Sequence, residues 1–224
     1  METIFENRIK LFEGNDLFYG IEEKDLESML KCLGATEKNY KKNTLMIRPG
    51  SAISSLGILM EGKAQITRDD EEGNTTIISE IEPGDLFAEA YAAAQVAEVP
   101  IGVWAVTPCR VLWIPIDKII TTCSSSCAFH QTLIKNMMKV LAKKNVLMNE
   151  KMRLLSCKTI RDKLLTYLRD CKTKSGKEYF FIPFSRKELA EFLSVDRSAM
   201  SRELGKLRNE GILECHKNVF KFSK

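Results

Sequence analysis

The chain has 224 residues, of which 44% are hydrophobic and 29% are charged, and its formal net charge at pH 7 is +4. This length is enough for two modest domains, each with its own core. No apolar run approaches the roughly 20 residues that a membrane span needs, and the N-terminus lacks the basic and apolar parts of a secretion signal, so we expect a cytoplasmic protein. The seven cysteines include no CxxC pair, and we expect most of them to be reduced thiols.

The positive charge is concentrated in the C-terminal third of the chain. Residues 151–224 contain 18 Lys+Arg and 9 Asp+Glu, a net charge of +9, whereas residues 1–150 contain 16 and 21, a net charge of −5. This division predicts that the C-terminal part binds a polyanion and that the N-terminal part has another task.

Residues 1–126 are predicted to form a β-rich domain behind a short helix. The helix is indicated by apolar residues at helical spacing, namely Leu26, Met29, Leu30 and Leu33. Short β-prone runs follow at 44–47, 57–60, 64–67, 75–81, 103–106 and 111–114, separated by turn residues such as Pro49-Gly50 and Pro83-Gly84. This spacing favours a small antiparallel barrel or jelly roll.

Residues 127–155 are predicted to form one long helix that pairs two copies of the chain. Seam residues alternate at spacings of four and three: Ile134, Met138, Leu141, Asn145, Met148, Met152 and Leu155. That period is typical of a parallel coiled coil, in which Asn145 fixes the register with its counterpart. A second apolar line is expected to contact the same subunit's roll, namely Leu133, Met137, Val140 and Leu147. The alternative is a core helix in a monomer.

Residues 156–224 contain two short predicted helices joined by a tight turn. Ser185 and Glu188 have the spacing of a capping box at the start of the first helix. Residues 194–196 form the turn, with Asp196 as the N-cap of a second helix over 197–209 that Gly211 ends.

The second helix has one apolar face and one polar, basic face. The apolar face holds Met200, Leu204 and Leu207, and the other face holds Arg197, Ser198, Ser201, Arg202 and Lys206. Such a helix suits the major groove of DNA, and the β-prone runs at 178–184 and 219–222 predict a winged helix-turn-helix. An ordinary helical hairpin with a solvated charged face is the alternative.

The ordered combination of these motifs resembles the Crp/Fnr transcription regulators. The matching residues are Gly50, Gly57 to Ala64, Pro83 to Phe87 and the helix-turn-helix. The resemblance implies an α+β fold in which a double-stranded β-helix, similar to a cyclic-nucleotide-binding domain, precedes a dimerisation helix and a winged helix-turn-helix. It also implies a homodimer that binds a palindromic site on double-stranded DNA and contacts RNA polymerase.

The same resemblance implies roles for side chains on the second helix. Arg197, Ser198 and Arg202 match base-reading positions, and Arg202 is the first candidate for a bidentate contact to guanine. The expected phosphate contacts are Ser201, Lys206, Arg186 and Lys187.

The ligand cassette departs from that of the cyclic-AMP binders in this family. Val99-Pro100 stands where the family pattern has an Arg-Ser pair for the cyclic phosphate, and residues 87–102 contain no Lys or Arg. A buried phosphate here would lack a partner, so we expect neither cyclic AMP nor cyclic GMP to be the effector. Asp85 stands at the acidic position, although a turn or capping role is the more common one for such a residue.

We predict no cofactor and no metal site, and an unknown small-molecule effector remains open. Its candidate pocket comprises Asp85, Phe87, Glu89, Tyr91, Val99, Pro100, Trp104 and Asn145. The cysteine pattern does not suit an iron–sulfur cluster, and neither histidine lies in the roll to bind haem. Cys123, Cys127 and His130 are spaced more widely than a zinc site requires.

The preferred function is a homodimeric, sequence-specific DNA-binding regulator. The alternative is a ligand-binding or structural dimer without specific DNA readout. We expect no enzymatic activity, because no nucleophile-base pattern and no phosphate loop stand out.

Overall fold

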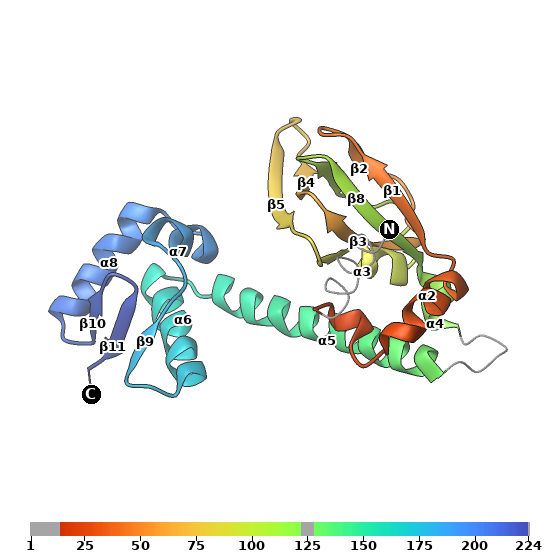
Figure 1. The fold of residues 1–224 in the computed structure, drawn as a ribbon. Helices are drawn as coiled ribbons and strands as arrows, with labels where there is room; N and C mark the ends of the chain where they lie inside the picture. The colour runs from red at the N-terminus through yellow and green to blue at the C-terminus, as the bar shows by residue number, and fades with distance from the viewer. Residues whose placement is uncertain (1–13, 122–127, 224) are drawn as a thin grey trace. The chain divides into compact units, whose positions relative to one another are not determined.

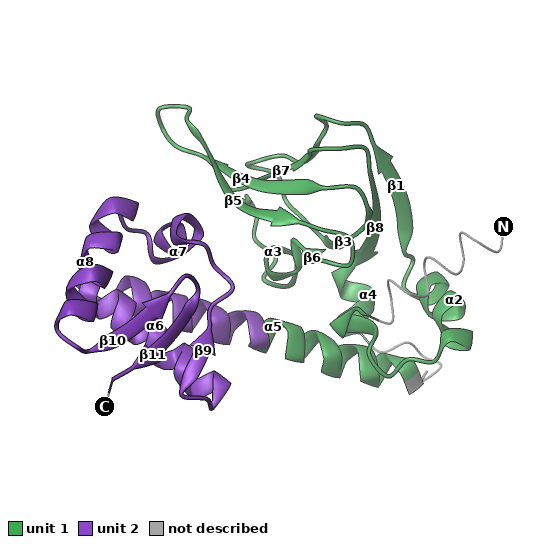
Figure 2. Ribbon diagram, turned by 60° about the vertical axis from the view of Figure 1, so that its left-hand side comes forward, with its two compact units in different colours: residues 1–142 green, residues 143–224 purple. Residues whose placement is uncertain are grey.

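The computed structural model describes residues 14–121 and 128–223, and the chain divides into two compact units, residues 1–142 and 143–224 (Figures 1 and 2). The long helix α5, Ala128–Leu155, begins in the first unit and ends in the second. Within the described ranges, no helix is long and apolar enough to cross a membrane.

The first unit is built on two antiparallel four-stranded sheets, with strand orders β1-β8-β3-β6 and β2-β7-β4-β5. The strands are β1 Thr36–Tyr40, β2 Leu45–Ile47, β3 Ser55–Glu61, β4 Ala64–Asp69, β5 Thr75–Ile81, β6 Leu86–Phe87, β7 Gly102–Ala105 and β8 Cys109–Pro115. The predicted roll is confirmed, and each of the six predicted β-prone runs overlaps a strand. β1 was missed because its first four residues are exposed and polar, so it lacks the apolar alternation of a half-buried strand.

Strand β3 is covered on both faces, which explains its nearly continuous apolar sequence. Leu56, Ile58 and Met60 belong to a core shared with the helices, whereas Leu59 belongs to the interior of the roll. Because side chains alternate along a strand, this single strand joins two hydrophobic cores.

Helices cover the outer face of the β1-β8-β3-β6 sheet (Figure 1). The short helices of this unit are η1 Asp16–Phe18, α2 Glu23–Cys32, α3 Glu89–Ala93 and α4 Ile116–Ile120. On α5, Leu133, Met137 and Val140 are buried, as the second apolar line predicted. Leu147, the fourth residue of that line, belongs to the second unit and is 62% exposed.

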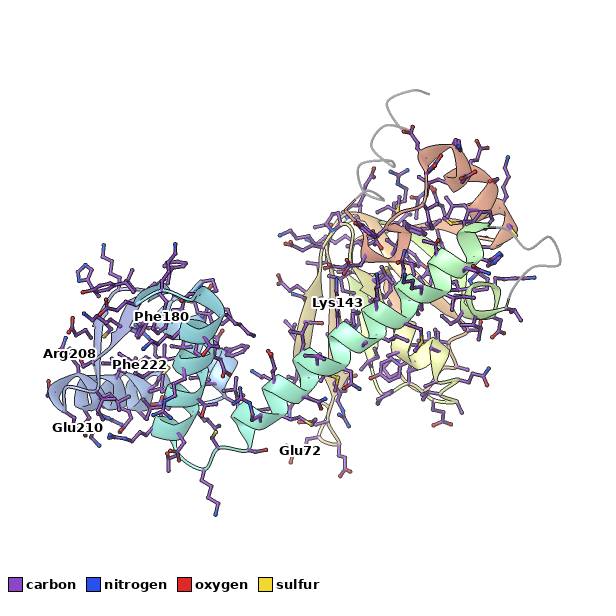
Figure 3. All side chains as sticks on the ribbon, turned by 90° about the horizontal axis from the view of Figure 1, so that it is seen from below. Glu72, Lys143, Phe180, Arg208, Glu210 and Phe222 are labelled. Atoms are coloured by element: carbon purple, nitrogen blue, oxygen red, sulfur yellow. The ribbon has the colours of Figure 1, made fainter. Side chains whose placement is uncertain are left out.

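The second unit is a winged helix-turn-helix behind an additional helix that we had not predicted. Its elements after α5 are α6 Ile160–Ser175, β9 Tyr179–Phe181, α7 Arg186–Leu193, α8 Arg197–Asn209, β10 Leu213–His216 and β11 Val219–Phe222. The three strands form an antiparallel sheet in the order β10-β11-β9. Phe180 and Phe222, labelled in Figure 3, stack with ring centroids 6.1 Å apart and join this sheet to the helical core.

Candidate nucleic-acid interface

A capping box fixes the start of α7. Ser185 Oγ accepts a hydrogen bond from the Glu188 amide at 3.3 Å, and the Glu188 carboxylate accepts one from the Ser185 amide at 2.6 Å. The amide of Ser185 holds the pKa of Glu188 below its usual value, because it stabilises the charged carboxylate. This reciprocal pair confirms the predicted start of the helix-turn-helix.

The turn between α7 and α8 has the geometry that the sequence predicted. Ser194 ends α7 in the left-handed region at φ 52°. Asp196 Oδ1 then caps α8 by accepting a hydrogen bond from the Ala199 amide at 2.7 Å. Gly211, at φ 69°, follows the end of α8 and has the conformational freedom for that turn.

Two lysines that we had not singled out support the end of α7. Lys151, on α5, donates to the carbonyl of Phe192 and lies 4.0 Å from the centre of its ring. Lys163, on α6, donates to the carbonyl of Leu193 at 3.1 Å. Burial is the main cause that lowers the pKa of Lys151, and repulsion from the nearby Lys163 charge lowers it further. Cations suit this position, because the last carbonyls of a helix lack helical partners and carry partial negative charge.

The recognition helix α8 is held from behind by its apolar residues and by one arginine. Met200 and Leu204 are buried in the core of the second unit. Arg161, on α6, contacts Glu203 at 3.4 Å and Glu210 at 3.0 Å, and the second bond lowers the pKa of Glu210. These contacts fix both the depth and the rotation of α8, whose end is marked by Glu210 in Figure 3.

The opposite face of α8 is polar and exposed to solvent. Arg197, Ser198, Ser201 and Arg202 are all exposed. Within the described residues, no carboxylate lies within salt-bridge distance of the Arg197 or Arg202 guanidinium. Lys206, with 67% of its side chain exposed, shares Glu203 with Arg161 at 3.5 Å. This face thus offers two guanidinium groups that no described carboxylate pairs with, and their planar donors match a guanine edge or a phosphate.

The two predicted phosphate contacts on α7 differ from each other. Lys187 is exposed and forms an i,i+4 pair with Glu191 at 3.8 Å. Arg186 is half-buried, lies over the Phe220 ring and donates to the Lys217 carbonyl at 3.1 Å. The Arg186 guanidinium thus supports the β10–β11 turn of the wing, and Lys187 is the more exposed of the two candidates on this helix.

The acidic residues of the ligand cassette also divide into two roles. Asp85 is exposed, and its carboxylate accepts a hydrogen bond from the Glu82 amide at 2.8 Å. It therefore holds a turn, which is the common role for an Asp at such a position. The buried carboxylate of the cassette is Glu89, 4% exposed, in the first turn of α3.

Two predicted pocket residues, Phe87 and Val99, lie in the core of the roll. Val99 is 1% exposed, and its backbone bonds to Gly50 and Ser51 at 2.8 and 3.0 Å. Phe87 is 2% exposed and fills the space over Gly57, where a Cβ atom would overlap its ring.

The remaining pocket candidates are less enclosed. Tyr91 is half-buried, Pro100 is exposed and Trp104 is 39% exposed. Asn145 lies in the other compact unit and is exposed on α5. Of the apolar members of the predicted set, Phe87 and Val99 are thus core residues, and Tyr91, Pro100 and Trp104 are accessible to solvent.

The predicted seam of α5 is partly exposed in the single chain. Met138, Met148 and Met152 are 64%, 65% and 54% exposed, whereas Ile134 and Leu141 are half-buried. The Asn145 side-chain oxygen accepts a hydrogen bond from the Asn149 amide group of the same helix at 2.8 Å. The helix therefore carries a line of apolar side chains with no cover within the described chain.

Of the three residues weighed for a metal, only His130 is described, and Cys123 and Cys127 lie outside the described residues. His130 is 3% exposed, and its Nε2 lies 3.1 Å from the Lys118 carbonyl oxygen. In residues 14–121 and 128–223, no group of three His, Cys, Asp or Glu side chains is arranged to hold a metal ion.

Two family models match the chain. A cyclic nucleotide-binding domain matches residues 37–126, and a Crp-like helix-turn-helix domain matches residues 162–221. The first match covers the roll, and the second covers most of α6 and the whole helix-turn-helix.

Solved structures with the same fold cover most of the chain. The catabolite activator protein of Thermus thermophilus is 20% identical, with 93% of each chain covered and a TM-score of 0.56. CprK in complex with OCPA is 19% identical, with 89% of each chain covered and a TM-score of 0.61. The c-di-GMP-responsive regulator CLP of Xanthomonas campestris is 18% identical, with 91% of this chain and 100% of that chain covered and a TM-score of 0.51. No curated protein matches the chain.

Proposed function

Because the chain belongs to the Crp/Fnr family of transcription regulators, we propose that it is a homodimeric, sequence-specific DNA-binding regulator whose effector is not a cyclic nucleotide. The observation that carries this proposal is the exposed face of α8, where Arg197 and Arg202 have no acidic partner among the described residues. A helix whose apolar side is packed into the core, and whose opposite side exposes two guanidinium groups, suits the DNA major groove.

On this face, Arg202 reads a guanine through its O6 and N7 atoms, and Arg197 and Ser198 contact neighbouring base edges. Lys187, Ser201 and Lys206 contact phosphates, which position the protein without reading sequence. The net charge of +9 on residues 151–224 supports this division of labour, since most non-specific affinity for DNA is electrostatic.

The second copy of the chain is proposed to pair through α5. Three exposed methionines, Met138, Met148 and Met152, supply an apolar line that a second α5 covers. In the dimer, Asn145 exchanges its partner on the same helix for its counterpart across the axis and so fixes the register. Two recognition helices related by a two-fold axis then match a palindromic site. RNA polymerase is proposed as a partner on family membership alone.

The effector proposal rests on the chemistry of the cassette. Residues 87–102 contain no cation, Val99 is buried among apolar side chains, and the buried ionisable residue is Glu89. A cyclic phosphate placed there would meet a carboxylate and no guanidinium. An effector bound in the cassette is therefore proposed to be neutral.

The competing function is a dimer that keeps the fold and no longer reads sequence. Such a protein does not need exposed arginines on α8, whereas this chain keeps Arg197 and Arg202 unpaired by the described carboxylates. We therefore favour the regulator. The family consists of regulators, and we propose no catalytic role for the chain.

The proposed function is tested by selecting bound sequences from a random duplex library with the full-length protein. The selected duplex should bind at least about 1,000 times more tightly than a scrambled one near physiological salt. Arg202→Ala should reduce that ratio by about 10- to 100-fold, because it removes a base contact. Lys187→Ala, an exposed cation on α7, is the control and should weaken both duplexes alike. Equal affinity of the unmodified protein for both duplexes would rule out the regulator.

The effector proposal is tested by calorimetric titration with cyclic AMP and cyclic GMP. We expect no saturable heat from either nucleotide, because the cassette lacks a donor for the phosphate. Saturable binding at micromolar concentration would contradict the assignment of Val99 and Pro100.

A further inference from the structure

A groove of about 460 Å³ opens on the first unit. It is lined by β1, β2, β8 and the segment that leads from β2 into β3. Its volume is in the range of small-molecule sites. None of the residues predicted for the cassette pocket lines it.

Apolar side chains form much of the groove lining. Tyr40 and Ile47 are buried there, while Trp113 and Ile53 are half-buried. The Trp113 indole N–H donates to the Tyr40 hydroxyl at 3.0 Å, which fixes both rings. The hydroxyl accepts that bond, so its own hydrogen is available to a ligand.

The rim of the groove is cationic. Lys38 and Arg48 are exposed at its edge, and the lining includes no Asp or Glu. Within the described residues, neither cation forms a salt bridge, and the contact recorded for the Lys38 ammonium is with the Tyr40 ring at 5.1 Å. This is the reverse of the cassette, where residues 87–102 contain no cation.

Hydroxyl groups complete the set of donors. Ser54 and Ser55 line the groove next to the cations, and their side chains have no hydrogen-bond partner among the described residues. Ser51 is engaged, because its hydroxyl donates to the Arg48 carbonyl at 2.6 Å and so fixes the backbone beside the guanidinium. The groove thus offers two cations and three hydroxyl donors, those of Tyr40, Ser54 and Ser55, beside two aromatic rings. This combination suits one class of ligand, an oxyanion attached to a flat apolar ring.

We propose that this groove binds a small aromatic carboxylate or aromatic phosphate, with the ring against Trp113 and Tyr40 and the oxyanion at Arg48 and Lys38. The proposal concerns binding by the roll itself. Ligand binding in the groove is therefore tested separately from DNA binding, and a negative result in one experiment does not contradict the other.

Trp113 is a built-in reporter for the groove. The chain has two tryptophans, and the other one, Trp104, does not line the groove. In the full-length Trp104→Phe protein, the fluorescence of Trp113 is therefore titrated with benzoate, phenyl phosphate, inorganic phosphate and neutral benzamide. We expect saturable changes with the first two probes at dissociation constants of about 1 mM or below. Benzamide and inorganic phosphate should each bind about 10-fold more weakly, since each lacks one half of the ligand.

Matched variants locate the anion. Arg48→Met in the Trp104→Phe background should weaken benzoate and phenyl phosphate by about 10-fold. Lys42→Met removes the same charge from the nearby β1–β2 turn and should change either constant by less than about 2-fold. Thermal unfolding of each variant checks that the roll is intact. Tighter binding of benzoate than of phenyl phosphate, or the reverse, would identify which oxyanion the groove prefers. Either order would support the proposed ligand class.

Three results would overturn the proposal. One is the absence of saturable binding of either aromatic anion up to about 10 mM, well above the expected constants. Another is equal binding of benzamide, or of inorganic phosphate, which would remove the anion or the ring from the ligand class. The third is an Arg48→Met protein that binds as tightly as the Lys42→Met control.

Discussion

The recognition helix α8 and the ligand cassette differ in where they place charge. On α8, Arg197 and Arg202 are in solvent while Met200 and Leu204 are buried behind them. In the cassette, Lys and Arg are absent from residues 87–102 and the interior is filled by apolar side chains such as Val99. Both regions lie in domains whose family models describe phosphate-containing ligands, either DNA or a cyclic nucleotide.

The difference shows that a scaffold and its phosphate-binding chemistry are separable. In the absence of DNA, an arginine on α8 hardly destabilises the folded protein, because water solvates its guanidinium group. An arginine buried inside the cassette without an anionic ligand beside it would lack a partner, and that is a large penalty. The two regions thus keep or lack cations according to whether solvent or a ligand can satisfy them.

The largest expected effect comes from putting the missing cation back. Val99→Arg should lower the free energy of unfolding of the first unit by about 3 kcal/mol or more, because Val99 is 1% exposed among apolar side chains and a guanidinium there loses its hydration. Both tryptophans, Trp104 and Trp113, lie in this unit, so urea unfolding followed by tryptophan fluorescence reports on it alone.

The control for this substitution is Ile78→Arg on β5. Ile78 is 54% exposed in the same unit, so the same guanidinium stays in water and should change stability by less than about 0.5 kcal/mol. A Val99→Arg protein as stable as Ile78→Arg would break the comparison, since the cassette would then tolerate a cation without its ligand.

The next effect tests whether α5 pairs two copies of the chain. Met148→Asp should weaken dimerisation on the order of 100-fold, because it places a carboxylate opposite its own copy on the proposed seam. Sedimentation should change from a species near twice 25.5 kDa to one near 25.5 kDa as the protein is diluted. Met148→Leu keeps the apolar seam and should remain a dimer. If the unmodified protein sediments as a monomer at micromolar concentration, the seam is not an interface.

Much of the fold could be predicted because its signals are local. Turn residues and short apolar runs marked six strands, and Ser185, Glu188, Asp196 and Gly211 marked the ends of α7 and α8. Strand β1 left no such local signal, for a physical reason. The exposed, polar residues of β1 are held by pairing with β8, whose residues lie far along the chain, and such a contact leaves no local pattern.

The candidate site was less predictable, because the partner of a charged side chain depends on packing. Arg186, Arg197 and Arg202 look alike in sequence, yet only Arg186 reaches the wing turn. Lys151 and Lys163 lie some 30 to 40 positions from the carbonyls that they hold, so no motif pointed to them. Helical spacing also placed Leu147 with Leu133, although their surroundings differ in the two units.

A smaller effect is expected at the N-cap of α7, the helix that precedes α8. Ser185→Ala should lower the free energy of unfolding of the second unit by about 1 kcal/mol, because it removes the N-cap of α7. Circular dichroism is the suitable probe, since both tryptophans lie in the other unit. A loss below about 0.3 kcal/mol would mean that packing alone fixes α7.

The partner of this cap adds a pH dependence. The pKa of Glu188 is lowered in the folded chain, so its stabilising contact is present above the unfolded value near 4.5 and is lost as the pH falls through the folded pKa. Glu188→Gln should therefore melt below the unmodified protein at pH 7, and the two melting temperatures should converge below about pH 4. A difference that persists at low pH would show that the carboxylate charge is not its source.

The smallest expected effect separates the two kinds of cation on the helix-turn-helix. Lys206 is exposed and already shares Glu203, so its replacement by Ala should weaken selected and random duplexes alike, by about 3-fold, and lower the slope of log affinity against log salt by about 1. Lys31→Ala removes the same charge from α2 in the first unit and should leave the slope unchanged. If Lys206→Ala instead weakened only the selected duplex, Lys206 would read a base. The exposed face of α8 would then carry sequence information over its whole length, and its contrast with the cation-free cassette would be greater than the present assignment allows.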